Sequence, residues 1–248
     1  MFSELYVQGI GIAETLPRDN YVANLPAVRQ ILSQGGLELR QRVTFLVGEN
    51  GMGKSTLLEA IAVAMGFNPE GGTRNYLFST KDSHSELYRY LRVRRGIRRP
   101  KDGYFFRSES FYNAATYLEE LEHTPYCGGV LQSYGGKSLH QRSHGESFMA
   151  LVENRFGGNG IYLLDEPESA LSPARVMELM CWMDTLVKQD SQLIIATHSP
   201  MLITFPNAEI LELRGDGMRR VTYRETELFQ LTRRFLETPE RMLAHLLG

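Results

Sequence analysis

The residues best suited to chemistry lie in a glycine-rich segment of the first third of the chain. It reads GENGMGKS from Gly48 to Ser55 and follows an apolar run that starts at Val43. Glycines let a backbone turn tightly and aim its N–H groups at one point, and the positive end of a following helix also attracts an anion. The segment therefore predicts a loop that binds phosphate groups.

A nucleotide is the ligand that this loop favours. Lys54 can reach the β- and γ-phosphates, and the hydroxyl of Ser55 can hold Mg²⁺. An apolar stretch with helical spacing follows and ends at Gly66, as such a loop requires. A glycine-rich turn without a ligand is the alternative. The residues predicted to bind the nucleotide are Gly48, Glu49, Asn50, Gly51, Met52, Gly53, Lys54, Ser55 and Thr56.

Two adjacent acids form the second chemical group. Asp165 and Glu166 directly follow the apolar run from Ile161 to Leu164. Open α/β sheets bind their ligands at the carboxyl ends of the strands. We expect Asp165 to hold Mg²⁺, directly or through water, and Glu166 to polarise the attacking water. Taken alone, the pair is also compatible with an ordinary solvated turn.

Two shorter segments complete the candidates. The SHGES sequence from Ser143 to Ser147 opens a predicted helix, where backbone N–H groups and a hydroxyl can contact phosphate oxygens. A plain capped helix would show the same letters. His198 ends a buried strand, from which it can donate a hydrogen bond to a γ-phosphate, although a lone histidine is more often structural.

These segments need a scaffold that brings strand ends together. Apolar strands are predicted before the phosphate loop, at Ile161–Leu164 and at Leu193–Ala196, and helical segments separate them. One helix should start at Ser172, its N-cap, and run to about Gln189. Strands that are apolar throughout and alternate with helices favour an α/β fold with a mainly parallel sheet covered on both faces.

The remaining pattern is weaker. We expect one domain over residues 1–248, with an inserted, partly helical subdomain at about 75–157. Other predicted elements are a strand within residues 2–12, a loop at 18–26, a short helix around 28–32, strands at 37–40 and 104–106, a helix at 111–122, a glycine-rich loop at 128–137, a hairpin of 209–213 with 218–223, and a terminal helix from Thr238 and Pro239.

Charge and cysteine content exclude several classes. The formal net charge is −2, so no global field favours nucleic acid. The exception is a basic run from Arg89 to Lys101, which is either a phosphate-binding surface or a solvated face offset by acids. Cys127 and Cys181 have no metal or disulfide spacing, and no apolar window is long enough to span a membrane. We expect a cytoplasmic protein without membrane insertion.

The motifs GENGMGKS, SHGES, LLDEPE, SALS and THS, in this order, resemble those of ATP-binding-cassette (ABC) ATPases. The whole chain is similar to small stand-alone bacterial ATPases of the AAA/ABC type, whose relatives include the RecF/SMC group. The resemblance implies a P-loop NTPase fold with an antiparallel N-terminal β portion. It places Ser143, Gly145 and Glu146 in the ABC signature, Ser169–Ser172 in the D-loop, and His198 as the switch histidine.

The resemblance also implies an activity. ATP would be hydrolysed to ADP and phosphate with Mg²⁺, and Lys54, Glu166 and His198 would be the catalytic residues. The signature of one subunit would cap the nucleotide of the other in a head-to-tail homodimer. Tyr21, upstream of the phosphate loop, is the candidate for stacking on adenine.

Some features depart from the family pattern. SHGES replaces the transporter-type LSGGQ, and no glutamine stands at the Q-loop, where Ser108 or Glu109 is the candidate substitute. No heptad segment predicts a coiled-coil arm. A switch in a DNA-related or defence process, with nucleic acid or an unidentified protein as partner, is the favoured function. The ATP-binding subunit of a membrane transporter and a non-hydrolysing regulator are the alternatives.

Overall fold

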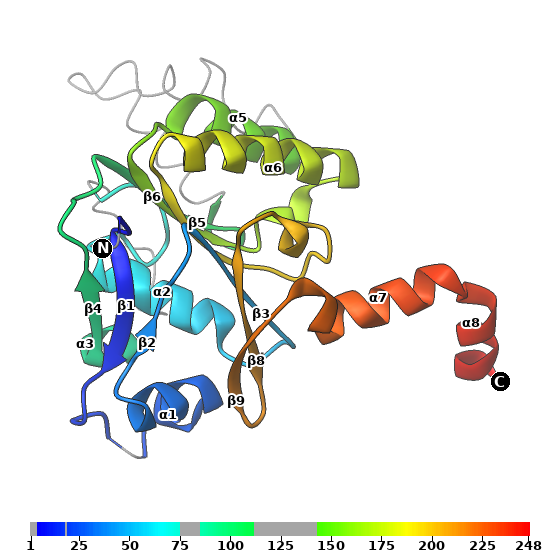
Figure 1. The fold of residues 1–248 in the computed structure, drawn as a ribbon, viewed down its shortest axis with the longest axis horizontal. Helices are drawn as coiled ribbons and strands as arrows, with labels where there is room; N and C mark the ends of the chain where they lie inside the picture. The colour runs from blue at the N-terminus through cyan, green and yellow to red at the C-terminus, as the bar shows by residue number, and fades with distance from the viewer. Residues whose placement is uncertain (1–3, 18, 75–84, 112–142) are drawn as a thin grey trace.

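The computed structural model describes residues 4–17, 19–74, 85–111 and 143–248, which form a six-stranded and a three-stranded sheet with helices around them (Figure 1). The strands are β1 (Val7–Ile12), β2 (Leu37–Glu38), β3 (Val43–Gly48), β4 (Leu91–Arg95), β5 (Asp102–Arg107), β6 (Gly160–Asp165), β7 (Gln192–Ala196), β8 (Glu209–Arg214) and β9 (Gly217–Val221). The α-helices are α1 (Pro26–Ser33), α2 (Lys54–Ala64), α3 (Leu87–Tyr90), α5 (His144–Arg155), α6 (Pro173–Lys188), α7 (Glu227–Glu237) and α8 (Pro239–Leu247). Four short 3₁₀ helices are η1 (Tyr21–Asn24), η4 (Pro167–Ala170), η5 (Leu202–Thr204) and η6 (Tyr223–Glu225).

The larger sheet has the strand order β5-β6-β7-β3-β8-β9. Its first five strands are parallel, and β9 returns antiparallel to β8 as the predicted hairpin. The carboxyl ends of β3, β6 and β7 therefore meet at one edge, where the phosphate loop, the acid pair and the segment of His198 follow them. The predicted α/β fold with a mainly parallel sheet is confirmed.

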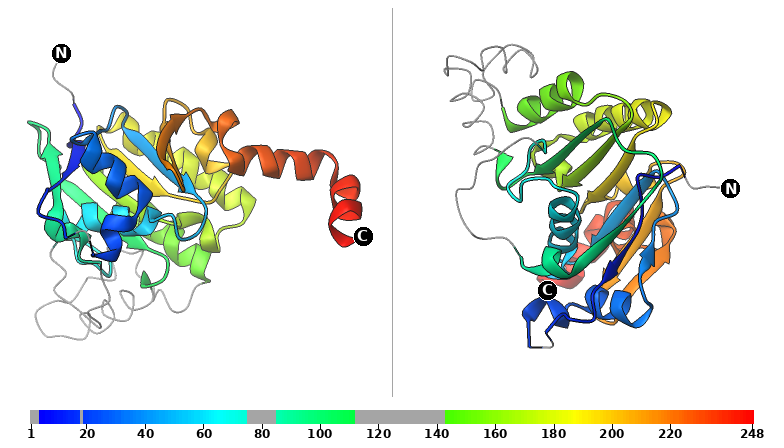
Figure 2. Two further views of the ribbon diagram at one scale, coloured as in Figure 1. Left: turned by 90° about the horizontal axis from the view of Figure 1, so that it is seen from below. Right: turned by 90° about the vertical axis from the view of Figure 1, so that its left-hand side faces the viewer.

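Helices cover the two faces of this sheet separately. Alternate residues along each strand enter different cores: Leu46 packs with α1 and α2, whereas Phe45 packs with α5 and α6. Two-residue periodicity explains this division, because successive side chains of a strand point to opposite faces. The helix after the phosphate loop and the helix that opens with SHGES consequently lie on opposite faces of the sheet (Figures 1 and 2).

The smaller sheet is antiparallel and joins the N-terminus to the basic segment. Its order is β2-β1-β4, and β1 pairs with β4 from Ile12↔Leu91 to Val7↔Arg95. The range 75–157 thus contributes β4 to this sheet and β5 to the larger one. The helix expected at 111–122 and the loop expected at 128–137 lie outside the described residues, apart from Phe111, and the inserted subdomain stays a prediction.

The segment predicted as a loop at residues 18–26 contains helical turns. Asn20 Oδ1 accepts a hydrogen bond from the backbone N–H of Val22 at 3.1 Å and caps η1. Pro26 then starts α1, where its fixed φ and missing N–H are tolerated. Residues that favour turns also favour helix starts, which explains the difference.

A C-terminal arm made of α7 and α8 leaves the body of the molecule (Figures 1 and 2). The sequence pattern predicted α8 but not α7, although Thr226 caps α7 by accepting from Phe229 N–H at 3.2 Å. Neither helix contains a fully buried residue. Among the described residues, no helix combines the length and apolarity needed to cross a membrane; a cytoplasmic location stays a prediction.

Candidate functional site

The phosphate loop has the backbone that its glycines predict. Gly51 and Gly53 have φ values of 80° and 87°, which residues with a Cβ adopt rarely. A Cβ at Gly53 would also meet the side chain of Leu25 at 3.1 Å. The loop is therefore held between the start of α2 and the segment that precedes α1.

Lys54 is buried and directed at its own loop. Its Nζ donates to the carbonyl oxygens of Gly48 and Glu49, each at 2.9 Å. Burial lowers the pKa of this ammonium group, and the nearby carboxylates of Glu166, Asp165 and Glu168 act in the opposite direction. The Lys54 ammonium group thus donates to neutral carbonyl oxygens of its own loop, and it can exchange them for a more negative acceptor.

Ser55 at the start of α2 and Asp165 at the end of β6 come together. Ser55 Oγ donates to Asp165 Oδ1 at 2.8 Å. Two ligands at adjacent corners of an octahedral Mg²⁺ site are about 3.0 Å apart, since Mg–O distances are about 2.1 Å. The pair, made of hard oxygen donors, therefore fits the cation that a nucleotide would bring.

Asp165 lies in an environment that penalises its charge. Burial raises its pKa to about 6, against the lowering effects of the Ser55 hydrogen bond and of Arg107, and with a further rise caused by Glu166 and Glu109. A bound cation would supply the missing positive charge. The buried position of Asp165 is unlike a solvated turn, and its role as a metal ligand stays a prediction.

Glu166 has a left-handed backbone, with φ 49° and ψ 54°. This conformation is uncommon for a residue with a side chain and is found mainly where neighbouring structure enforces it. The N–H of Glu166 donates to the carbonyl of Ala196 at 2.9 Å, which ties the acid pair to the end of β7. The resulting turn brings Glu166 Oε1 within 3.5 Å of His198 Nε2.

His198 offers an open donor at this edge. Its Nε2 is shielded from solvent and has no hydrogen-bond partner among the residues that the structure describes. In nucleotide sites a histidine at this strand end can contact a phosphate oxygen. Apart from the approach of Glu166 Oε1 at 3.5 Å, no described group competes for this atom, and its contact with a γ-phosphate stays a prediction.

Glu168 is a residue of the site to which we assigned no role from the sequence. Its Oε1 accepts from Thr197 Oγ1 at 2.7 Å and from the backbone N–H of His198 at 2.6 Å. It thereby fixes the His198 segment to the turn after β6. The position of Glu168 in LLDEPE, two residues after Glu166, could have marked it as a site residue. Its contacts with Thr197 and His198 join segments far apart in the chain, so the sequence spacing does not predict them.

The expected place of the Q-loop lies beside Asp165. β5 pairs with β6 up to Arg107↔Asp165, and the N–H of Ser108 donates to the Asp165 carbonyl at 3.4 Å. Arg107 bonds Glu59 of α2 at 2.7 Å, so this strand end is also joined to the helix after the phosphate loop. Ser108 and Glu109 accordingly remain the candidate substitutes.

The SHGES segment forms a capped helix start. Ser143 Oγ accepts from Glu146 N–H at 3.3 Å, and Glu146 Oε2 accepts from Ser143 N–H at 2.9 Å. A Cβ at Gly145 would meet the carbonyl of Ala170 at 2.6 Å, so this glycine lets α5 approach the expected D-loop. The structure joins the two segments on the face of the sheet opposite α2.

Tyr21 begins η1 and is 61% exposed. Leu25, one turn later, reaches the phosphate loop at Gly53. The 3₁₀ helix that Tyr21 begins therefore precedes a residue close to the loop, and the role of Tyr21 in binding adenine stays a proposal.

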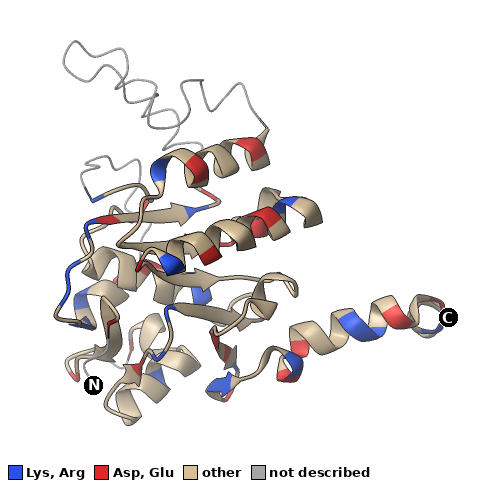
Figure 3. Cartoon of the chain, turned by 45° about the horizontal axis from the view of Figure 1, so that its top comes forward, with Lys and Arg blue, Asp and Glu red and all other residues tan. Residues whose placement is uncertain are grey.

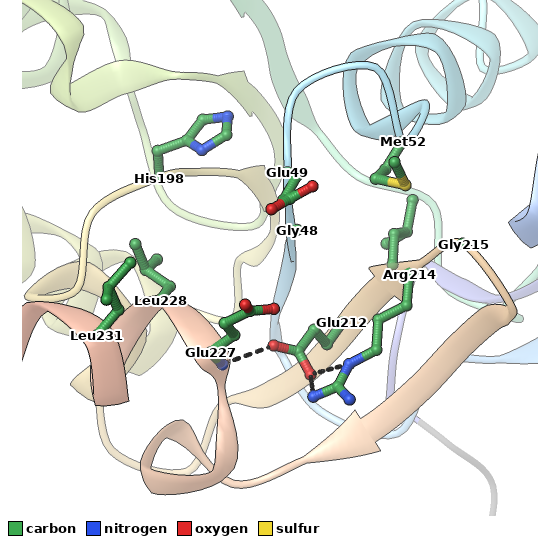
Figure 4. A pocket seen from close by; sticks show the side chains of 11 residues that line it. Gly48, Glu49, Met52, His198, Glu212, Arg214, Gly215, Glu227, Leu228 and Leu231 are labelled. Atoms are coloured by element: carbon green, nitrogen blue, oxygen red, sulfur yellow. Dashed lines mark hydrogen bonds and ion pairs between the residues drawn. The ribbon is translucent and has the colours of Figure 1, made fainter. Parts of the chain in front are cut away.

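A pocket adjoins the phosphate loop on its other side (Figure 4). Its walls come from the loop, the turn between β8 and β9, the segment after β7 and the base of α7. Within the pocket, Glu212 forms an ion pair with Arg214 and accepts a hydrogen bond from the backbone N–H of Glu227 at 2.9 Å. The lining residues are Gly48, Glu49, Met52, His198, Glu212, Leu213, Arg214, Gly215, Glu227, Leu228 and Leu231.

The basic segment is largely offset by acids. Arg94 pairs with Glu38 and Arg98 with Asp190, at 3.1 and 3.4 Å, and Arg89 pairs with Glu86 within its own turn. Figure 3 shows acidic and basic residues interspersed over the body. This arrangement favours the solvated face over a dedicated phosphate-binding surface.

Two protein-family models match separate parts of this chain. A family model described as "AAA domain, putative AbiEii toxin, Type IV TA system" matches residues 140–204, and a second AAA domain model matches residues 27–124. No curated protein gives a significant sequence match.

Among solved structures, the chain is similar to "a putative metal-chelate type ABC transporter" in an inward-facing conformation. That match has a TM-score of 0.50 and 14% identity and covers 91% of this chain and 87% of the other. A dimeric bacterial ABC transporter cassette matches with TM-score 0.46, 20% identity and 77% and 90% coverage. The cbiO1 protein of Clostridium perfringens matches with TM-score 0.43, 17% identity and 86% and 90% coverage.

The fold and the two family matches together support a P-loop ATPase of the AAA/ABC type. ATP binding and hydrolysis are the activities that this class implies.

Proposed function

We propose that the protein binds Mg-ATP at the carboxyl edge of its larger sheet and hydrolyses it to ADP and phosphate. The observation that carries this proposal is the convergence of three strand ends. Lys54 and Ser55 follow β3, Asp165 and Glu166 end β6, and His198 follows β7, with the Ser55–Asp165 and Glu166–His198 contacts linking them. Phosphoryl transfer depends mainly on such positioning and on charge stabilisation.

Each residue has a defined task in this scheme. Lys54 exchanges its two carbonyl acceptors for phosphate oxygens, which are stronger acceptors. Ser55 and Asp165 hold Mg²⁺, which neutralises charge on the phosphates. Glu166 orients the attacking water and accepts its proton, while His198 donates to the γ-phosphate from a position fixed by Glu168.

We further propose that two copies close head to tail around two ATP molecules. SHGES opens a helix on the face of the sheet opposite α2, away from the phosphate loop of its own chain. The SHGES segment of a second copy would therefore cover the nucleotide at this loop. Backbone N–H groups at the start of α5, with Ser143 and Gly145, would contact the phosphates from the far side. Release of phosphate would then open the dimer.

Glu166→Gln tests both parts, because the amide keeps the shape of the acid but cannot accept the proton. We expect ATP turnover to fall at least about 100-fold, while Mg-ATP binding persists and closes two subunits on each other. Sedimentation velocity would show this shift as a doubled mass if the subunits start as monomers, or as a more compact, faster-sedimenting dimer if they are already paired. Lys54→Ala is the matched control that should lose both binding and the shift. Retained turnover would refute the role of Glu166, and bound ATP with no change in sedimentation would refute the sandwich.

We propose that this dimer acts as a switch in a defence-type or DNA-related process. The AAA model whose description mentions a toxin supports the first, and it covers the acid pair and His198. For the second, Arg92, Arg95 and Arg99 of the basic run form no ion pair with a described residue. Of these, Arg95 donates to the carbonyl of Ala64 at 3.1 Å. Salt-dependent binding of duplex DNA that disappears in an Arg92→Ala/Arg99→Ala variant would favour the DNA-related process; its absence would favour a protein partner.

A further inference from the structure

The C-terminal arm carries an apolar surface that no described part of the chain covers. Among the residues that the structure describes, nine large apolar side chains are exposed, and six of them belong to α7 and α8. The six are Leu231, Phe235, Leu236, Leu243, Leu246 and Leu247. Only the base of α7 packs on the body, through the partly buried Leu228 and Phe229. The rest of these two short helices gains little from propensity alone, because helices of this length are marginal in water without packing.

The described body offers no matching apolar surface. The other three exposed side chains, Tyr21, Ile97 and Met177, lie on η1, after β4 and on α6, and are isolated from one another in sequence and element. The remaining surface of comparable character is the same arm on a second copy. A contact between identical surfaces is possible around a two-fold axis.

The charge of the arm supports a partner like itself. Its acids and arginines balance, as the red and blue segments in Figure 3 show. An arm that binds nucleic acid or an anionic membrane would be expected to carry net positive charge. An arm that binds a basic partner would be expected to carry net negative charge. A neutral arm with both signs can pair with its own copy without net repulsion. The charged residues are Glu227, Glu237 and Glu240, and Arg233, Arg234 and Arg241.

The size of the arm is adequate for a modest interface. α7 and α8 have 11 and 9 residues, so they are about 16 and 14 Å long. Packing both against a second arm would bury on the order of 500 Å² from each copy, or about 1,000 Å² in total, the lower end for a specific contact.

The base of the arm lies at the nucleotide site. Leu228 and Leu231 line the pocket that also contains Gly48 and Met52 of the phosphate loop and His198 (Figure 4). An arm fixed by a second copy would therefore hold one wall of that pocket in place. Two copies held in this way would keep their ATP sites on one assembly.

We propose that the α7–α8 arms of two copies pack against each other and form a dimer that does not require nucleotide. The occupant of the apolar face is thus a second copy of this chain. This contact is separate from the ATP-dependent closure, which joins the SHGES segment to the phosphate loop. The arms hold the pair together while ATP opens and closes it.

The test uses the full chain without nucleotide, in sedimentation velocity at micromolar concentration. The unchanged protein should sediment as a dimer, and a Leu243→Glu/Leu246→Glu variant should be a monomer. Its dimer dissociation constant should be at least about 100-fold larger, because two charges would enter the contact in each copy. Ile97→Glu, which also replaces an exposed leucine-sized side chain but outside the arm, is the matched control and should remain a dimer. Circular dichroism should show equal helix content in all three.

Other outcomes overturn the proposal. The proposed arm contact is refuted if the unchanged protein sediments as a monomer, or if the Leu243→Glu/Leu246→Glu variant stays dimeric. A monomer that co-sediments with vesicles of phosphatidylcholine and phosphatidylglycerol through its arm identifies a membrane surface as the occupant instead. Adding Glu166→Gln to the arm variant separates the two proposals, because this protein should dimerise only with Mg-ATP if the ATP sandwich holds.

Discussion

The carboxyl edge of the larger sheet, where we propose that ATP binds, and the C-terminal arm differ in the surroundings of their side chains. At the edge, Lys54, Ser55 and Asp165 are shielded from solvent or nearly so and contact groups of the same chain. In the arm, apolar side chains from Leu231 to Leu247 face solvent. A site whose polar groups are held by its own chain is ready for a small ligand, whereas an apolar helical face without neighbours requires a macromolecule.

The largest expected effect is at Lys54. Lys54→Ala removes the cation that balances the phosphates, and we expect ATP turnover to fall at least about 100-fold, with ATP binding lost in calorimetry. Arg98→Ala, at an exposed ion pair with Asp190, is the control and should leave turnover unchanged. ATP binding as tight as in the unchanged protein would place the nucleotide elsewhere.

Glu168 tests whether the edge is held by its own chain. Glu168→Ala leaves Thr197 Oγ1 and the His198 N–H without their acceptor, which should destabilise the fold by about 1 to 3 kcal/mol. Displacement of His198 should lower kcat about 10-fold with little change in KM.

Glu168→Gln keeps an acceptor oxygen and should recover most of kcat, which a purely structural loss would not predict. Glu153→Ala, at an exposed glutamate of α5, should change neither quantity. Normal kcat in Glu168→Ala would show that His198 needs no support from this carboxylate.

Asp165 should make stability depend on pH when no metal is present. Its pKa is raised from the ordinary 3.8 to about 6 in the folded chain, so the folded state holds the proton more tightly than the unfolded state. This contribution is fully present below pH about 4 and is lost as the pH rises through about 6. Asp165→Asn should therefore gain about 2 kcal/mol relative to the unchanged protein between pH 4 and pH 8.

Urea unfolding in EDTA at both pH values measures this difference. Mg-ATP should reverse the order at pH 8, because only the carboxylate binds the cation well and a ligand of the folded state stabilises it. A pH-independent difference between the two proteins would show that Asp165 is not penalised by burial.

The smallest effect is expected in the arm. Leu236 is 72% exposed, and Leu236→Ser in the monomeric Leu243→Glu/Leu246→Glu background should change the free energy of unfolding by less than about 0.5 kcal/mol. Leu163→Ala, at a fully buried position of β6, should cost about 3 kcal/mol in the same background. A large loss at Leu236 would mean that the arm packs within its own chain.

Local rules were sufficient for much of the site. Gly53 was predicted to allow a tight turn and has φ 87°. Ser172 was predicted as an N-cap, and its Oγ accepts from Arg175 N–H at 3.4 Å. Such features depend on the backbone preferences of a few adjacent residues, so the sequence is enough to locate the phosphate loop, the strand that ends at Asp165 and the helix starts at Ser143 and Ser172.

Contacts between distant segments were decided by the tertiary structure. The link from Glu168 to the His198 segment, the pairing of β4 with β1, and the position of SHGES on the face opposite α2 each join residues far apart in the chain. The spacing of leucines in α7 and α8 does not tell whether the apolar face of each helix is buried or exposed. The sequence therefore determined which residues could bind phosphate and form helices, whereas packing determined which of them meet and left the apolar arm outside the core.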